Sequence, residues 1–172
     1  MLEWSAYDRQ AAVAYAHRWA YRRNMIYYDY EDIGGDCTNF ASQCLYAGSE
    51  VMDYTPDFGW YYINANDKAP AWTGVEYLYR YLVRQEPTPG PAAVEVGLRQ
   101  VMPGDIVQLS FREDGTFSHT AVVVRVPARA TLRTVLVASH SYDADNRPLS
   151  TYSFRKIRFL HIAGVWRKAG DI

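Results

Sequence analysis

Residues 34–44 read GGDCTNFASQC, a glycine pair followed by the start of a helix. Two adjacent glycines break regular structure, and the aspartate after them is a residue type that commonly caps a helix N-terminus. Four apolar residues then recur at the spacing of one helical face: Phe40, Ala41, Cys44 and Leu45. Because Gly48 suits a helix end, the pattern predicts a half-buried helix that begins at the glycine pair and carries Cys37 in its first turn.

Two further helices are predicted, one on each side of this segment. Ser5 and Asp8 resemble a capping box. The residues after them place five side chains on one helical face: Ala11, Ala12, Tyr15, Ala16 and Trp19. Thr73 and Glu76 form a second capping box, and the helix that follows ends at the proline-rich residues 87–91.

The pattern changes to strands after Gly104. Four strands are expected, at residues 105–111, 119–126, 134–141 and about 154–163, and Asp114-Gly115 is typical of a hairpin turn. Helices followed by a run of antiparallel strands indicate an α+β fold. A chain of 172 residues suits one domain.

The composition argues against nucleic-acid binding and membrane insertion. The net charge is -1 with both signs mixed, so no nucleic-acid partner is expected, and the short basic runs at residues 22–23 and 155–158 suit solvated faces. No apolar run suggests a transmembrane segment, and the N-terminus lacks the basic and apolar blocks of a signal peptide. The 15 Tyr and 5 Trp predict amphipathic packing, a groove that stacks on sugar or peptide, or both.

Cys37 is the residue with the clearest chemical potential. On one helix it would lie about 10 Å from Cys44, beyond the reach of about 7 Å that a disulfide allows. A helix start stabilises negative charge, both on a thiolate and on the oxyanion of a tetrahedral intermediate. An isolated cysteine is more often a small buried apolar residue, but the polar neighbours of Cys37 favour a nucleophile.

A cysteine nucleophile needs a base, and His119 is the best placed of the four histidines. It begins a predicted strand just after a turn, whereas His17 and His161 suit structural positions. His140 ends the next strand, so it could accept the Nδ1–H of His119 and orient the ring. Three residues in the following loop are alternatives for this third role: Asp143, Asp145 and Asn146.

Five motifs together resemble the bacterial family described as putative amidase domain, within the papain-like cysteine hydrolase superfamily and related to NlpC-type and CHAP cell-wall hydrolases. They are residues 34–44, 59–62, 103–107, 118–120 and 139–143. The resemblance covers almost the whole chain, and only the first motif is specific by itself. It implies a papain-like domain over residues 1–172, with N-terminal helices packed on a C-terminal antiparallel sheet.

The resemblance also implies the catalytic roles: Cys37 as nucleophile, His119 as base and His140 as the orienting residue. Related enzymes place a tyrosine upstream of the cysteine, which makes Tyr27, Tyr28 and Tyr30 candidates near the oxyanion; Asp36 and Trp60 are further candidates for substrate contact. Glu31 stands where papain-type enzymes have a glutamine. No cofactor or metal is implied.

The leading hypothesis is hydrolysis of an amide (peptide) bond through a thioester intermediate. The resemblance implies cell-wall peptides as the substrate and an extracytoplasmic location. The alternative is a catalytically silent module of the same fold that binds peptide or glycan. A metal site built from Cys37, His119 and His140 lacks the usual ligand spacings. The sequence leaves open the scissile bond and the oligomeric state.

Overall fold

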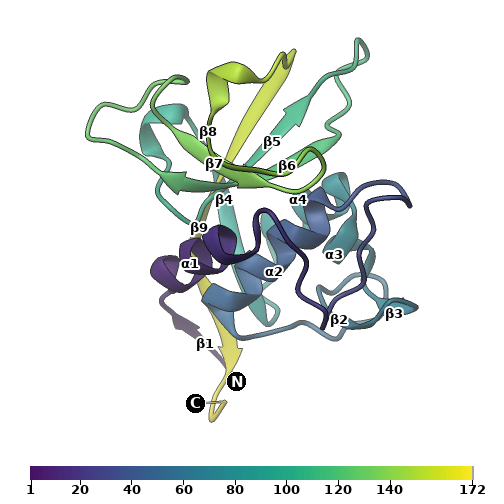
Figure 1. The fold of residues 1–172 in the computed structure, drawn as a ribbon. Helices are drawn as coiled ribbons and strands as arrows, with labels where there is room; N and C mark the ends of the chain where they lie inside the picture. The colour runs from purple at the N-terminus through teal and green to yellow at the C-terminus, as the bar shows by residue number, and fades with distance from the viewer. Residues whose placement is uncertain (172) are drawn as a thin grey trace.

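The computed structural model describes residues 1–171 and shows an α+β fold, in which helices cover one face of a seven-stranded antiparallel sheet (Figure 1). The helices are α1 (Arg9–Trp19), α2 (Cys37–Ser49), α3 (Pro70–Thr73) and α4 (Val75–Leu82), with short 3-10 turns η1 (Leu98–Gln100) and η2 (Leu149–Thr151). The strands are β1 (Leu2–Ser5), β2 (Tyr62–Asn64), β3 (Asp67–Lys68), β4 (Gly90–Val96), β5 (Ile106–Ser110), β6 (His119–Arg125), β7 (Leu136–Ser139), β8 (Ala144–Pro148) and β9 (Lys156–Lys168).

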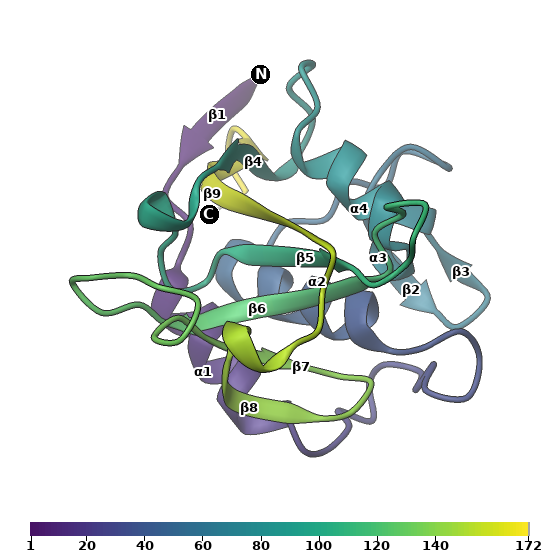
Figure 2. The same ribbon diagram turned by 90° about the horizontal axis from the view of Figure 1, so that it is seen from above.

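The sheet is organised around the long strand β9. Its order is β1-β9-β5-β6-β7-β8, and β4 pairs along the other side of β9. Figure 2 shows β5, β6 and β7 running beside one another above α2. All these pairings are antiparallel, with Leu109 opposite His119 and Val122 opposite Ala138. His119 therefore begins a central strand, at the end of β6 that adjoins the β5–β6 turn.

The two faces of the sheet support separate apolar clusters. One joins the helices to sheet residues such as Val122 and Ala138, while the other contains Leu109, Ala121 and Val123 and packs beneath η2. Side chains alternate between the faces of a strand. Successive residues of β6 therefore face the helices and the opposite cluster in turn.

Most predicted elements are confirmed, but their boundaries need correction. Ser5 lies in β1 and does not cap a helix; Asp8 caps α1, and its carboxylate accepts the Ala11 N–H at 2.9 Å. Residues 90–96 form β4 because they pair with β9 at an edge of the sheet, where Pro91 is tolerated. Such long-range pairings leave little local signal in the sequence.

The helix boundaries around α2 and α4 also differ from the prediction. Gly48 lies inside α2, which ends at Ser49, and a Cβ at Gly48 would come within 2.4 Å of the Tyr7 ring. The small side chain thus serves helix packing. The Thr73–Glu76 capping box does not form, because Thr73 belongs to α3 and Gly74 precedes α4.

The two basic runs are not simply solvated faces. The Arg158 guanidinium is buried, lies over the rings of Tyr79 and Phe117 and donates to Gln108 Oε1 at 2.6 Å. Arg23 forms an ion pair with Asp143 at 2.9 Å. None of the helices formed by residues 1–171 has the length and apolar composition needed to cross a lipid bilayer.

Candidate active site

Cys37 is the first residue of α2, as the sequence predicts, and its side chain is 8% exposed. Gly34 and Gly35 turn the chain into this helix with φ values of +88° and +97°, a region that disfavours residues with a Cβ. A Cβ at Gly35 would lie 3.1 Å from Ser141 Oγ, whereas one at Gly34 would meet nothing within 4 Å. The approach to the helix start is therefore open beside Gly34 and tight beside Gly35.

Asp36 precedes the helix but does not cap it with its side chain. Its carboxylate accepts hydrogen bonds from His140 Nδ1 at 2.5 Å, Asn39 Nδ2 at 2.8 Å and the Tyr30 N–H at 2.9 Å. His140 Nε2 donates to the Trp19 carbonyl at 2.8 Å. Both side chains of this pair are almost fully buried, so they fix the start of α2 against α1 and the end of β7.

The loop after β7 also holds the chain just before α2 in place. Ser141 Oγ accepts the Asp36 N–H at 3.0 Å, and Asp143 pairs with Arg23, which also contacts Glu31 at 3.2 Å. Neither Ser141 nor Arg23 was among the residues predicted for the site. Their contacts join residues more than 100 positions apart, so no local pattern could have indicated them.

The Cys37 sulfur lies among hydrogen-bond donors at the start of α2. The Thr38 hydroxyl is 3.7 Å from Sγ, and backbone hydrogen bonds from Thr120 and Thr38 lower the thiol pKa. Burial is the larger effect, however, and it raises the pKa of Cys37 above its ordinary value. Burial therefore opposes the ionisation that the helix start was expected to promote, and the thiol of Cys37 keeps its proton at neutral pH.

His119 is 7% exposed and lies on the face of β6 opposite the helices. Neighbouring side chains of β6 point to opposite faces of the sheet. Thr120 Oγ1 lies 2.9 Å from Thr38 Oγ1 in α2, whereas the His119 ring lies near the rings of Phe111 and Tyr152. Burial lowers the pKa of His119 to about 4, and the positive charge of Arg147 adds to the effect. The imidazole is therefore neutral at pH 7.

In the described part of the chain, the His119 ring and the Cys37 sulfur are connected only through Thr120. Within residues 1–171, the buried Nε2 of His119 has no hydrogen-bond partner, and no hydrogen bond joins its ring to the Cys37 sulfur. The two residues are connected by Thr120, which follows His119 in the chain and whose backbone bonds to the sulfur. The structure thus brings the thiol to the residue next to His119.

The predicted hydrogen bond between His140 and His119 is wrong. Val122 lies opposite Ala138, so the same register puts His140 on the face of Thr120 and not on that of His119. Both ring nitrogens of His140 bond to Asp36 and Trp19 instead. A shift of one residue along a strand is enough to move an imidazole to the other face.

The alternative third residues also have other partners. Asp143 pairs with Arg23, and Asp145 lies 2.8 Å from His17 Nδ1. Asn146 adopts a left-handed conformation in β8, with φ of 51°. Among the described residues, none of the three is hydrogen-bonded to His119.

The predicted substrate contacts divide into buried and exposed residues. Trp60 is fully buried, where its Nε1 donates to Ser42 Oγ at 3.0 Å, so the prediction that it contacts substrate is wrong. Tyr27 stacks on Trp72, and the Tyr30 hydroxyl donates to the Ala65 carbonyl. Tyr28 is 44% exposed, and its carbonyl accepts a hydrogen bond from Asn39.

Asp36 differs from these aromatic residues because its carboxylate points into the protein. It supports the segment around Cys37 from the interior of the protein. Asp105, in the Pro103-Gly104-Asp105 motif, has a similar structural role: it accepts from Arg9 at 2.6 Å and from the Ile162 N–H at 2.9 Å. Residues 1–171 contain no cluster of three or more histidine, cysteine or acidic side chains able to hold a metal ion.

Residues 6–163 match the family model described as "Putative amidase domain". The chain belongs to this family. This amidase-named domain is also 35% identical over 144 residues to the uncharacterized protein YhbB of Bacillus subtilis (strain 168), an alignment that covers 82% of this chain and 43% of YhbB. The chain spans less than half the length of that relative. No solved structure matches it.

Membership of the amidase-named family supports a hydrolase-like activity.

Proposed function

We propose that this domain is a cysteine-dependent amide hydrolase, with Cys37 as nucleophile and His119 as acid–base residue. The observation that carries the proposal is the position of the Cys37 sulfur at the start of α2, a helix whose first turn has no side-chain cap. N–H and O–H donors surround the sulfur, and one of them belongs to Thr120, the residue that follows the neutral imidazole of His119. Such donors stabilise a thiolate and an oxyanion in the same place.

The protonation states favour proton transfer at the moment of attack. Burial keeps the thiol protonated and the imidazole unprotonated at neutral pH. His119 takes the proton from Sγ as the sulfur bonds to the amide carbon, which requires the ring to approach the sulfur when substrate binds. Free imidazole nitrogens and loose geometry before substrate binds are common in such sites.

The remaining steps follow from that transfer. Electrons of the C=O bond move to the oxygen, whose negative charge faces the first-turn N–H groups of α2. When the C–N bond breaks, the His119 imidazolium gives its proton to the leaving amine, and a thioester to Cys37 remains. His119 then takes a proton from water, the hydroxide equivalent attacks the thioester, and the acid product leaves as the thiol is protonated again.

The substrate class rests on the family resemblance and on the shape of the approach. A peptide, such as a peptidoglycan stem peptide, has the extended backbone that could pass Gly34, where no side chain occupies the space. Tyr28 presents its ring to solvent in the segment that Asn39 holds against α2. We assign to Tyr28 a contact with the substrate next to the scissile amide.

The test is hydrolysis of stem peptides and of N-acyl peptide p-nitroanilides by matched variants. Cys37→Ala and His119→Gln should each lower kcat/KM by at least about a thousandfold. Cys44→Ala is the matched control: Cys44 lies on the same helix and is fully buried, so its loss should change stability more than turnover.

Retention of full activity by Cys37→Ala would overturn the proposal. Saturable binding of the stem peptide by the wild-type protein without any turnover would overturn it as well, in favour of the binding module considered above.

A further inference from the structure

Two adjoining hollows lie at the far end of β6 from His119. One, of about 880 Å³, lies between η1, the loop that joins β6 to β7, and η2. The other, of about 600 Å³, continues along the same loop and shares Arg99, Ala130 and Thr131 with the first. Since β6 rises about 3.3 Å per residue, its length alone separates them from His119 by roughly 20 Å.

Three arginines border these hollows without any carboxylate partner. Arg99, Arg129 and Arg133 are exposed, and none of them forms an ion pair within residues 1–171. No aspartate or glutamate lines either hollow. The three guanidinium groups therefore give the hollows a positive charge that no acidic side chain of their lining offsets.

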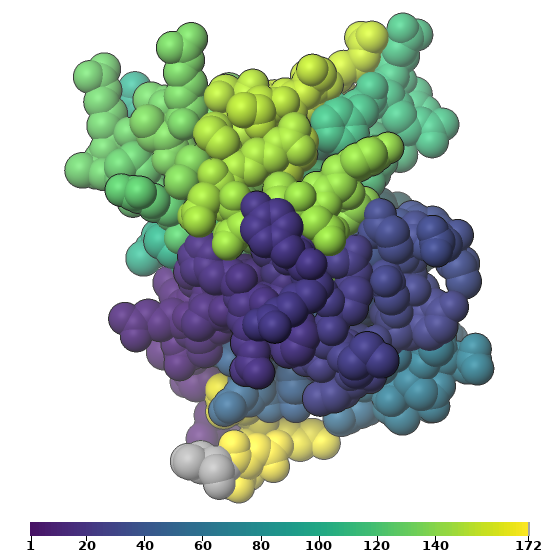
Figure 3. All heavy atoms as spheres, viewed as in Figure 1, coloured from purple at the N-terminus to yellow at the C-terminus, as the bar shows by residue number. Residues whose placement is uncertain are grey.

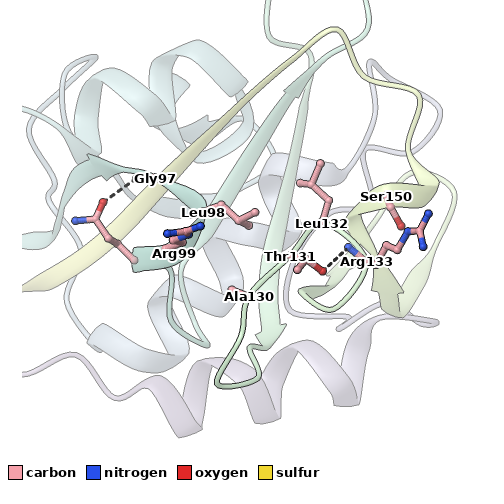
Figure 4. A pocket seen from close by; sticks show the side chains of 9 residues that line it. Gly97, Leu98, Arg99, Ala130, Thr131, Leu132, Arg133 and Ser150 are labelled. Atoms are coloured by element: carbon pink, nitrogen blue, oxygen red, sulfur yellow. Dashed lines mark hydrogen bonds between the residues drawn. The ribbon is translucent and has the colours of Figure 1, made fainter.

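The floor between the arginines is apolar. Figure 4 shows the side chains of Leu98 and Leu132 lying between Arg99 on one side of the hollow and Arg133 on the other. Both leucines are half-buried against the cluster on the outer face of the sheet. The surface therefore offers an apolar contact flanked by guanidinium groups.

We propose that this surface binds a short acidic peptide segment that carries an aliphatic side chain between its carboxylates. The aliphatic side chain would cover Leu98 and Leu132, and the carboxylates would meet Arg99 and Arg133, whose planar groups match carboxylates in a two-point contact. Arg129 would meet a further carboxylate along the second hollow.

The lining discriminates against other anionic partners. It contains no aromatic ring on which a nucleic-acid base could stack. A phosphate polymer would leave the leucine floor uncovered. Leu98 and Leu132 line a hollow of about 880 Å³, which suits an inserted side chain better than a flat bilayer.

The accessibility of the site is evident from its place in the molecule. The loop between β6 and β7 extends from the body in Figure 1, and in Figure 3 this part of the chain projects side chains at the upper left. This proposal is independent of the proposed hydrolase activity, since the hollows and the Cys37 site contain no residue in common.

The experiment is fluorescence anisotropy with the peptide fluorescein-Gly-Glu-Leu-Asp-Leu-Glu and the full chain. Saturable binding is expected, weakened about fivefold by Arg99→Gln or Arg133→Gln and about 25-fold by both together, since exposed charge pairs contribute up to about 1 kcal/mol each. Arg112→Gln is the matched control, because Arg112 is exposed in the β5–β6 turn at the other end of β6. It should bind the peptide like the wild type.

Two altered peptides test the recognition chemistry. Replacing the acidic residues with Gln and Asn, or both leucines with Ser, should weaken binding at least about fivefold. The proposal is overturned by absence of binding, by equal binding of the neutral peptide, or by an equal effect of Arg112→Gln. Tighter binding of a single-stranded oligonucleotide or of phosphatidylglycerol vesicles, lost in the double arginine variant, would also overturn it.

Discussion

Replacing His140 with leucine should destabilise the protein severely, because the imidazole satisfies two buried groups at once. The change removes the donors to Asp36 Oδ2 and to the Trp19 carbonyl. Breaking a buried ion pair costs about 3–5 kcal/mol, and an unpaired buried carbonyl adds at least about 1 kcal/mol. Arg23 Nε, 3.7 Å from Asp36 Oδ2, offsets part of this loss. A decrease of about 4 kcal/mol in the free energy of unfolding is expected.

Urea unfolding followed by tryptophan fluorescence measures this loss. A double-mutant cycle with Asp36→Asn should give a coupling energy of about 2 kcal/mol or more, because the two side chains share one interaction. His17→Leu is the control: its pair with Asp145 lies at the surface and should contribute less than about 1 kcal/mol. A loss below about 1 kcal/mol for His140→Leu would refute the assignment of a buried supporting pair.

Three further predictions follow from the site. The pKa of His119 is about 4 in the folded chain and near its ordinary value of 6.5 in the unfolded chain. Protonation therefore favours unfolding, and the free energy of unfolding should fall by about 2.5 kcal/mol between pH 7 and 4.5. Urea titrations of His119→Gln should lack this part of the pH dependence. Gly35→Ala should cost about 1–3 kcal/mol, because φ is +97° and Ser141 Oγ is close; an unchanged urea midpoint would contradict this. Because burial raises the pKa of Cys37, its iodoacetamide alkylation, followed by peptide mass spectrometry, should be slow at pH 7 and accelerate above pH 9; a rate that is already maximal at pH 6 would show an ionised thiol.

The parts of the fold that could be predicted are those encoded locally. The glycine pair and the apolar stripe after it are enough to place Cys37 in the first turn of α2, and a turn followed by a valine run is enough to begin β6 at His119. Each depends on neighbouring residues only.

The parts that could not be predicted depend on register and on distant contacts. His140 faces the helices because of how β7 pairs with β6, and sequence spacing does not fix that register. Trp60 was a candidate for substrate contact, but its indole packs on Trp72 and Tyr81 inside the core. Aromatic composition alone does not distinguish a buried ring from an exposed one.

The central claim is that Cys37 forms a covalent acyl intermediate. The direct test is acid quenching during turnover of an N-acyl peptide p-nitroanilide, followed by mass spectrometry of the peptide that contains Cys37. The account predicts the acyl mass on Cys37, removable by hydroxylamine, retained in Cys44→Ala and absent from Cys37→Ala. Turnover without any acyl mass on Cys37, or with the acyl group on another residue, would contradict it.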